Sequence, residues 1–336
     1  MYRNFTAASQ IGICCLASFL LLVTPALAQT GNTIVGPPIL VALGSITNLI
    51  VVGVGSKLTA PVTARGFPLP TSLAGIAVTL HQSANPQSIP APILAVTPMS
   101  SCANHYPLIR EPCDQYTVLT IQIPFELWIP LPEAPPNWAS LVVTENGVAG
   151  GALEVGAAGY NLRTLAVTHA DGTIANWQRP AKSGEVMVLW AVGLGATPTV
   201  PTGQATPVPA PVSQLIPELS FEYRPNAPPI APYCAPAPQC HKPPDLFSGL
   251  TPGYAGLYQV NFVVPPPPAG TPPCNVIAGN SETVASNLTV TLIKFVSLGG
   301  GQLCVDPAGS SAADSAEVMA SAVHSALRRA VPPDII

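Results

Sequence analysis

The sequence predicts an all-β protein, with two tandem antiparallel β-sandwiches from an internal duplication and a short C-terminal helix. Two apolar, β-rich segments that begin and end on glycine lie 140 positions apart, at residues 44–55 and 184–195. Charged residues make up only 8% of the chain, whereas the exposed faces of helices normally carry many Lys and Glu. The 42 Pro and 27 Gly suit short strands joined by turns.

The first 28 residues are expected to be a secretory signal peptide. Arg3 supplies a positive start, and residues 11–23 form an apolar core shorter than the roughly 20 residues of a membrane-spanning helix. Ala28 closes a small-residue cleavage site before Gln29. A membrane anchor is the alternative. We therefore expect a secreted, extracellular, periplasmic or cell-surface protein with no membrane span after cleavage.

The repeat extends beyond the glycine-bounded segments. Residues 116–124 alternate between polar and apolar side chains and end on Pro, and residues 257–265 do the same. The glycine pairs that close the first segments are expected to serve a bulge or a turn with positive φ. The remaining strand pairs are expected to be 141–147 with 275–280, and 152–155 with 287–293.

The segment between the two halves and the C-terminal tail have different patterns. Residues 165–177 predict a hairpin that turns at Asp171-Gly172. Three consecutive glycines within residues 297–303 indicate a flexible break, and residues 312–330 have helical spacing. The predicted parts are a signal peptide (1–28), a first sandwich (29–158), a connector hairpin (159–180), a second sandwich (181–296) and a flexible tail with a short helix (297–336).

Six cysteines lie outside the signal segment, and an even number in an exported chain indicates disulfides. Two local pairs would each close a Pro-rich loop, and the remaining two cysteines would form a third bond. Other pairings stay open. The candidate pairs are Cys102 with Cys113, Cys234 with Cys240, and Cys274 with Cys304.

Several motifs together resemble a known family. Residues 69–80 match its "lPtsLgGvsVtv" segment, residues 181–195 match "pA-x-pGe-x-v-x-l-y-atGLG", and residues 249–261 match "aGl-x-pG-x-aGlyQvn". The chain resembles the secreted Solibacter-type C-terminal domain family of acidobacteria. The resemblance covers about residues 35–295 and implies two immunoglobulin-like modules of the IPT/TIG type. It brings no catalytic residues. The chain departs from the family by two cysteine-bearing insertions, within residues 91–124 and 233–244.

The sequence offers few groups that suit catalysis, a cofactor or a metal. His105 and His241 lie beside cysteines, but their spacing fits no standard zinc motif. The glycine pairs lack the full pattern of a phosphate loop, and no Gly-x-Ser-x-Gly is present. Carboxylate pairs such as Glu126 with Glu133, or Glu111 with Asp114, leave a secreted hydrolase as a weaker alternative. We expect a protein that is not an enzyme, with no catalytic, cofactor-binding or metal-ligating residues.

A binding surface is the stronger expectation. Tyr106, Tyr116, Trp128 and Trp138 cluster around the first insertion, and exposed aromatic residues are typical of ligand surfaces. The alternative is that the two Trp side chains pack against their own loop. The net charge of −4 and the lack of a basic patch oppose nucleic-acid binding. We expect adhesion, assembly or recognition at the cell surface, with an unknown protein or glycan as partner. The alternative is carbohydrate binding through Trp128 and Trp138.

Overall fold

The computed structural model describes most of the chain after the expected signal segment. It describes residues 32–308, apart from 56–57, 84, 102–111, 130–136, 160, 196–199, 212–217, 229–239, 242–245, 278–281 and 295–296. The predicted signal peptide, and the helix expected within 312–330, lie outside the described residues.

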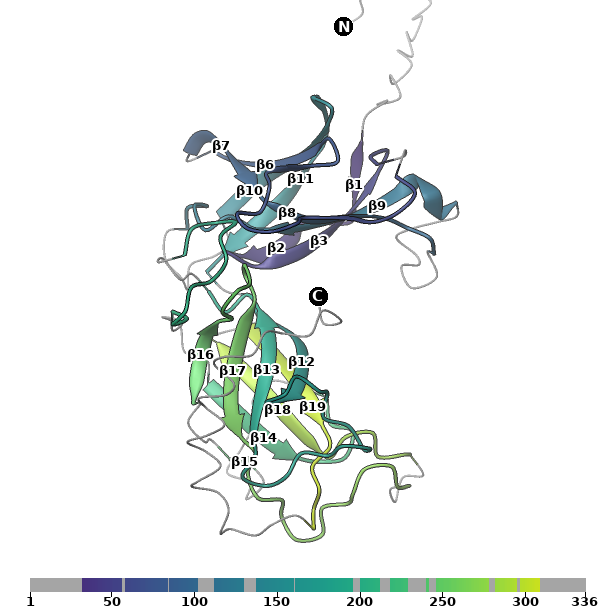
Figure 1. The fold of residues 1–336 in the computed structure, drawn as a ribbon, viewed down its shortest axis with the longest axis vertical. Helices are drawn as coiled ribbons and strands as arrows, with labels where there is room; N and C mark the ends of the chain where they lie inside the picture. The colour runs from purple at the N-terminus through teal and green to yellow at the C-terminus, as the bar shows by residue number, and fades with distance from the viewer. Residues whose placement is uncertain are drawn as a thin grey trace, which may run out of the picture. The chain divides into compact units, whose positions relative to one another are not determined.

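The first half consists of two sheets with the strand order of an immunoglobulin sandwich (Figure 1). One sheet has the order β1 (Thr33–Val35), β3 (Ile46–Val52), β9 (Tyr116–Gln122), β8 (Ile93–Pro98) and β4 (Val62–Thr63). The other has the order β2 (Ile39–Ala42), β11 (Val148–Ala158), β10 (Asn137–Glu145), β6 (Ile76–Gln82) and β5 (Ser72–Leu73), with β7 (Asn85–Ala91) also on β6. The strands are lettered in chain order, as in immunoglobulin domains. In the first sheet β1, β3, β9 and β8 are then strands A, B, E and D, and in the second sheet β6, β10 and β11 are strands C, F and G. We call the two sheets ABED and CFG.

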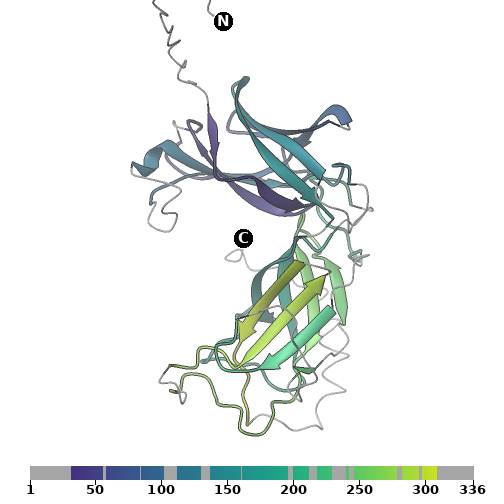
Figure 2. The same ribbon diagram turned by 180° about the vertical axis from the view of Figure 1, so that it is seen from behind.

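The second half repeats this topology, and Figure 2 shows its CFG strands side by side. Its ABED sheet has the order β12 (Arg163–His169), β13 (Val186–Val192), β17 (Tyr258–Val263) and β16 (Phe247–Leu250). Its CFG sheet has the order β15 (Cys240–His241), β14 (Glu218–Tyr223), β18 (Leu288–Lys294) and β19 (Ser297–Leu303). The chain is therefore all-β, with several sheets in two sandwiches.

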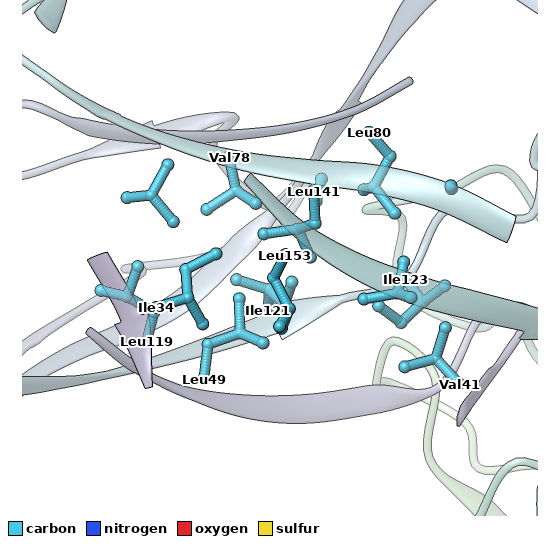
Figure 3. Close-up of a cluster of buried hydrophobic side chains, with 14 of the residues drawn as sticks. Ile34, Val41, Leu49, Val78, Leu80, Leu119, Ile121, Ile123, Leu141 and Leu153 are labelled. Atoms are coloured by element: carbon cyan, nitrogen blue, oxygen red, sulfur yellow. The ribbon is translucent and has the colours of Figure 1, made fainter. Parts of the chain in front are cut away.

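Each sandwich has its own hydrophobic core between its sheets. In the first, the side chains of β9 alternate, so that Leu119 and Ile121 point into the core that they share with Leu80 and Leu141 of the opposite sheet (Figure 3). In the second, Phe221 and Phe262 come from opposite sheets, with ring centroids 5.2 Å apart. Period-2 alternation places Leu119 and Ile121 inside, as expected for a half-buried strand, whereas β17 is buried along nearly all of its length.

Two strand assignments from the sequence were wrong. The counterpart of β10 is β18, not residues 275–280, and the counterpart of β11 is β19, not residues 287–293. The predicted flexible break at residues 297–303 is β19 itself, which pairs with β18 along its length. The second sandwich therefore extends beyond the predicted boundary at residue 296.

The glycines of β19 explain this error. A Cβ on Gly299 would lie 3.2 Å from the Thr164 hydroxyl, and one on Gly301 would lie 2.5 Å from a methyl carbon of Val167. Both neighbours belong to β12, the edge strand of the opposite sheet. The glycines therefore allow a close approach between two strands, and they do not mark a flexible segment.

The predicted connector is only partly separate from the second sandwich. Residues 163–169 form β12 and pair with β13, while Thr168 and Ile174 form an isolated bridge around the expected turn at Asp171-Gly172. The chain then reaches Ala181, which bridges Val305 in parallel. In the first sandwich, β2 pairs with β11 in parallel at the equivalent place.

Among the residues that the structure describes, the helical element is a single 3-10 turn at Cys113–Gln115. None of the helices in this part of the chain has the length and apolar character of a membrane span.

We predict that Gly301→Ala destabilises the second sandwich by about 1–3 kcal/mol, because the added methyl group overlaps Val167. Denaturant unfolding measures the change. Gly151→Ala is the matched control, since Gly151 lies in β11 and its Cβ would meet nothing within 4 Å. Equal stability of the two variants would contradict the close packing of β12 and β19.

Candidate recognition surface

The two tryptophans predicted as a binding surface are both exposed. Trp138 lies on β10 and is 50% exposed, while its neighbour Ala139 faces the core. Trp128 follows β9 and is 53% exposed. Residues 130–136, between the two tryptophans, lie outside the described residues, so packing of the indoles against their own loop stays the alternative. Trp138 projects from the outer face of the CFG sheet of the first sandwich.

A buried glutamine fixes the backbone of Trp128. Gln82 is 3% exposed, at the end of β6, and its carboxamide bonds both backbone polar groups of Trp128. Its Oε1 accepts from the Trp128 N–H at 2.8 Å, and its Nε2 donates to the Trp128 carbonyl at 3.1 Å. Asn137, the residue before Trp138, also donates to that carbonyl at 3.1 Å. The backbone of Trp128 therefore lies near the start of β10, where Trp138 also lies.

The strand register surrounds Trp138 with a defined set of residues. Trp138 pairs with Gly156 of β11, which in turn pairs with Leu40 of β2. Leu40 is 52% exposed. Residues in register lie about 5 Å apart, so an indole, a glycine and an isobutyl group form one row across three strands.

The next row on the same face is polar. Ser140 of β10 pairs with His81 of β6 on one side and with Glu154 of β11 on the other. The His81 ring is also in hydrogen-bonding range of Ser88, at 3.1 Å from Nδ1, and of Thr79, at 3.3 Å from Nε2. An apolar row with an aromatic ring thus lies beside hydroxyl, imidazole and carboxylate groups. We call these two rows the Trp138 face; the backbone of Trp128 lies nearby.

The other two predicted aromatic residues do not join this face. Tyr116 is on β9 of the opposite sheet, where it packs with Ile50, Met99 and Cys113 outside the main core. Its side chain therefore projects from the far side of the sandwich. Tyr106 lies outside the described residues. Sequence clustering had combined positions that belong to two different sheets.

Among the described residues, one disulfide has both of its cysteines described. Cys274 and Cys304 form a disulfide with a Cα–Cα distance of 5.9 Å. Cys113 is also disulfide-bonded, but Cys102 and Cys234 lie outside the described residues. Cys240 lies in the short strand β15.

The potential metal and phosphate sites have little support in the described residues. They contain no group of three or more His, Cys, Asp or Glu side chains placed to hold a metal ion. His105 lies outside them. All four glycines of the two Val-Gly-x-Gly sequences have positive φ, from 65° to 112°, as expected for turns. These glycines are Gly53, Gly55, Gly193 and Gly195.

Of the potential catalytic carboxylates, the described residues include Glu126 and Asp114. Glu126 accepts a hydrogen bond from the Thr202 hydroxyl at 2.6 Å, and Asp114 lies in the 3-10 turn. Their suggested partners, Glu133 and Glu111, lie outside the described residues. The exposed His81 and Ser88 are within hydrogen-bonding distance, but the second ring nitrogen of His81 meets Thr79 and not a carboxylate. This arrangement differs from a Ser-His-Asp triad.

Sequence reasoning missed Gln82 and the polar row. Gln82 lies 46 residues from Trp128, so no local pattern links them. A polar residue at a core position of the alternating strand β6 was the available signal.

Comparisons with family models and with curated proteins found no match for this chain. Membership of the Solibacter-type family is therefore not shown, and the resemblance rests on the quoted motifs.

Similar solved structures include proteins made of tandem immunoglobulin domains. The polymeric Ig receptor ectodomain of a teleost fish is 8% identical, with 83% of this chain and 100% of that chain covered, at a TM-score of 0.25. The tandem Ig repeats of Dlar are 10% identical, with coverage of 82% and 98% and a TM-score of 0.20. Domains 4–9 of the surface layer protein SbsC are 10% identical, with coverage of 82% and 30% and a TM-score of 0.22. At these TM-scores the likenesses carry no argument about function. The strand order described above defines the class, a protein of tandem immunoglobulin-like sandwiches.

We predict that Gln82→Met destabilises the first sandwich by about 1–3 kcal/mol, because both backbone polar groups of Trp128 lose a buried partner. Unfolding followed by tryptophan fluorescence measures this change. Asn137→Ala is the graded control, since it removes one exposed bond to the same carbonyl and is expected to cost less. A larger effect for Asn137→Ala would contradict the role of Gln82.

Proposed function

We propose that the protein is an exported, non-catalytic β-sandwich protein for adhesion, assembly or recognition at the cell surface or outside the cell. Its disulfide chemistry supports an oxidising compartment, since structural disulfides persist mainly in exported proteins. The expected signal peptide supports the same location.

The observation that carries the recognition role is the Trp138 face. An exposed aromatic ring on a sheet face forgoes the free energy of burial, and contiguous exposed apolar groups beside polar ones are typical of binding sites. The face is built on regular strands, so little order has to be imposed when a ligand binds. Tyr116 is not part of this proposed site.

Carbohydrate binding through this face is the second and more specific candidate function. A sugar ring has an apolar face that stacks on an indole, while its hydroxyl groups need donors and acceptors at the rim. Trp138 supplies the ring, and His81, Ser140 and Glu154 supply polar groups one row away. An unidentified protein partner on the same face is the other outcome of the test.

A secreted hydrolase stays the least supported function. The ionisable groups that pair in the described residues, such as His169 with Glu185 and Arg224 with Glu222, belong to local structural contacts. The release of reducing sugar ends from a bound polysaccharide would overturn the non-catalytic proposal.

We predict that Trp138→Ala weakens binding to a polysaccharide retained by the mature protein by at least about tenfold in Kd, because the stacking surface is lost. Affinity electrophoresis against a panel of soluble polysaccharides selects the ligand, and calorimetry measures Kd. Trp128→Ala is expected to weaken binding in the same direction.

Trp177→Ala is the matched control, because Trp177 is also 53% exposed but lies in the second sandwich. Equal losses for Trp138→Ala and Trp177→Ala would contradict the site. If no polysaccharide is retained, the carbohydrate candidate fails. Recognition is then tested by the aggregation of beads coated with the mature protein, with Trp138→Ala beads as the comparison. Aggregation that does not depend on Trp138 would overturn the proposed surface.

A further inference from the structure

The two sandwiches differ in the connection that follows strand A. In the first sandwich, residues 36–38 join β1 to β2, which then pairs in parallel with the G strand. In the second, residues 170–180 join β12 to Ala181, which makes the equivalent parallel bridge to Val305. We call residues 170–180 the A-loop. It is an enlarged form of a short crossover, and it exposes Ile174 (55%) and Trp177 (53%).

The A-loop is ordered by its own polar side chains. Asp171 accepts from the Thr173 N–H at 3.0 Å and pairs with the Arg179 guanidinium at 2.7 Å. Arg179 also donates to the Thr173 hydroxyl. The Asn176 side chain accepts from the Gln178 and Arg179 N–H groups at 2.9 and 3.0 Å. Burial opposes ionisation of Asp171, but the bonds from Thr173 and Arg179 hold its pKa well below the ordinary value.

One buried histidine joins the A-loop to the sheet. His169 is the last residue of β12, and its side chain is only 4% exposed. Its Nδ1 lies 2.6 Å from the Glu185 carboxylate, just before β13, and its Nε2 lies 3.2 Å from the Arg179 carbonyl in the A-loop. The second oxygen of Glu185 accepts from the Lys182 N–H at 2.9 Å.

Both atoms that face the imidazole are hydrogen-bond acceptors. A carboxylate and a carbonyl have no proton to donate, whereas a neutral imidazole carries a proton on only one nitrogen. The doubly protonated ring satisfies both contacts, and the neutral ring leaves one nitrogen lone pair facing an acceptor oxygen. The geometry therefore distinguishes the two protonation states.

We propose that His169, Glu185 and the Arg179 carbonyl form a pH-sensitive latch, which holds the A-loop against the second sandwich when His169 is protonated and loosens it when the proton is lost. The latch controls how firmly the loop presents Ile174 and Trp177.

The charges around the ring set the direction of the response. The ionisable groups that face His169 from the packed elements are Glu185, before β13, and Arg179, in the A-loop. The hydrogen bond to Glu185 raises the pKa of His169 above its ordinary value of 6.5, against the opposing effect of burial. Burial is the largest single influence on Glu185 and opposes its ionisation, but the hydrogen bonds from His169 and the Lys182 N–H, with the charges of His169 and Arg179, together outweigh burial and lower the pKa of that carboxyl below 4.5.

The signs give a pH window for the latch. A raised histidine pKa means that its stabilisation is complete below 6.5 and is lost as the pH rises through the folded-state value. A lowered glutamate pKa means that its stabilisation is present above 4.5 and is lost as the pH falls through the folded-state value. The latch is therefore strongest between these two limits and opens on the alkaline side at the titration of His169.

The experiment is an NMR titration of the mature protein with amide exchange at each pH. We expect His169 to titrate above 6.5 with both ring nitrogens protonated below that point. Exchange protection of the Gly172 and Arg179 amides, corrected for the intrinsic rate, is expected to fall as His169 deprotonates, because the contact between the His169 ring and the Arg179 carbonyl is then lost. The amides of β14 and β18 are expected to keep their protection.

Glu185→Gln removes the charge and is expected to lower the pKa of His169 and shift the loss of loop protection to lower pH. Glu222→Gln is the matched control, because its carboxylate pairs with Arg224 at 3.1 Å on the surface of the same sandwich. Should Glu185→Gln not fold, the wild-type titration decides alone. Loop protection that is constant across the titration of His169, or a His169 that titrates below 6.5, would overturn the latch.

Discussion

The close contact between β12 and β19 is the constraint on which the second sandwich depends. These strands are the edges of the two opposing sheets, and they meet where Gly299 and Gly301 have no side chain. The chain beyond β19 is then bound on both sides. Cys304 is bridged to Cys274, and the Val305 N–H donates to the Asn287 side chain at 2.8 Å. Without the glycines the sheets would separate at this edge, and the bonds that follow would lose their register.

The same edge positions the A-loop. The Ala181 N–H donates to the Cys304 carbonyl, and the Asp306 N–H donates to the Ala181 carbonyl, both at 2.8 Å. This end of the loop is therefore held by hydrogen bonds between backbone groups, which do not depend on the protonation of any side chain. The start of the loop is held by the backbone bridge between Thr168 and Ile174. The contact between the His169 ring and the Arg179 carbonyl is different, because it needs a second ring proton. Loss of that proton therefore loosens the loop locally, while the sheets that carry it keep their hydrogen bonds.

Much of the fold was predictable because strands B and E of each sandwich are recognisable within a single segment. Their residues either alternate between polar and apolar or are apolar throughout. The errors arose where a residue's role depends on a distant partner. Gly301 is close-packed only because Val167 lies opposite, and a run of glycines in isolation is equally typical of a flexible linker. Alternation also gives the face of a strand but not the sheet it joins, so Tyr116 and Trp138 were grouped although they belong to different sheets. Trp138 and Ala139 point to opposite faces of β10, and which of the two is exposed depends on the sheet that β10 joins.

The way in which each exposed tryptophan is supported distinguishes the two surfaces. Trp138 stands on a central strand and pairs with Gly156 of β11, and Trp128 has its backbone N–H and carbonyl bonded to a buried side chain. Only side-chain torsions remain to be ordered on binding, so little of the interaction free energy is lost to ordering the backbone. Trp177 lies in a loop whose attachment depends on the charge of His169, so a ligand there would also have to fix the loop whenever that charge is absent. A recognition surface that works over a broad range of pH is therefore better placed on the first sandwich.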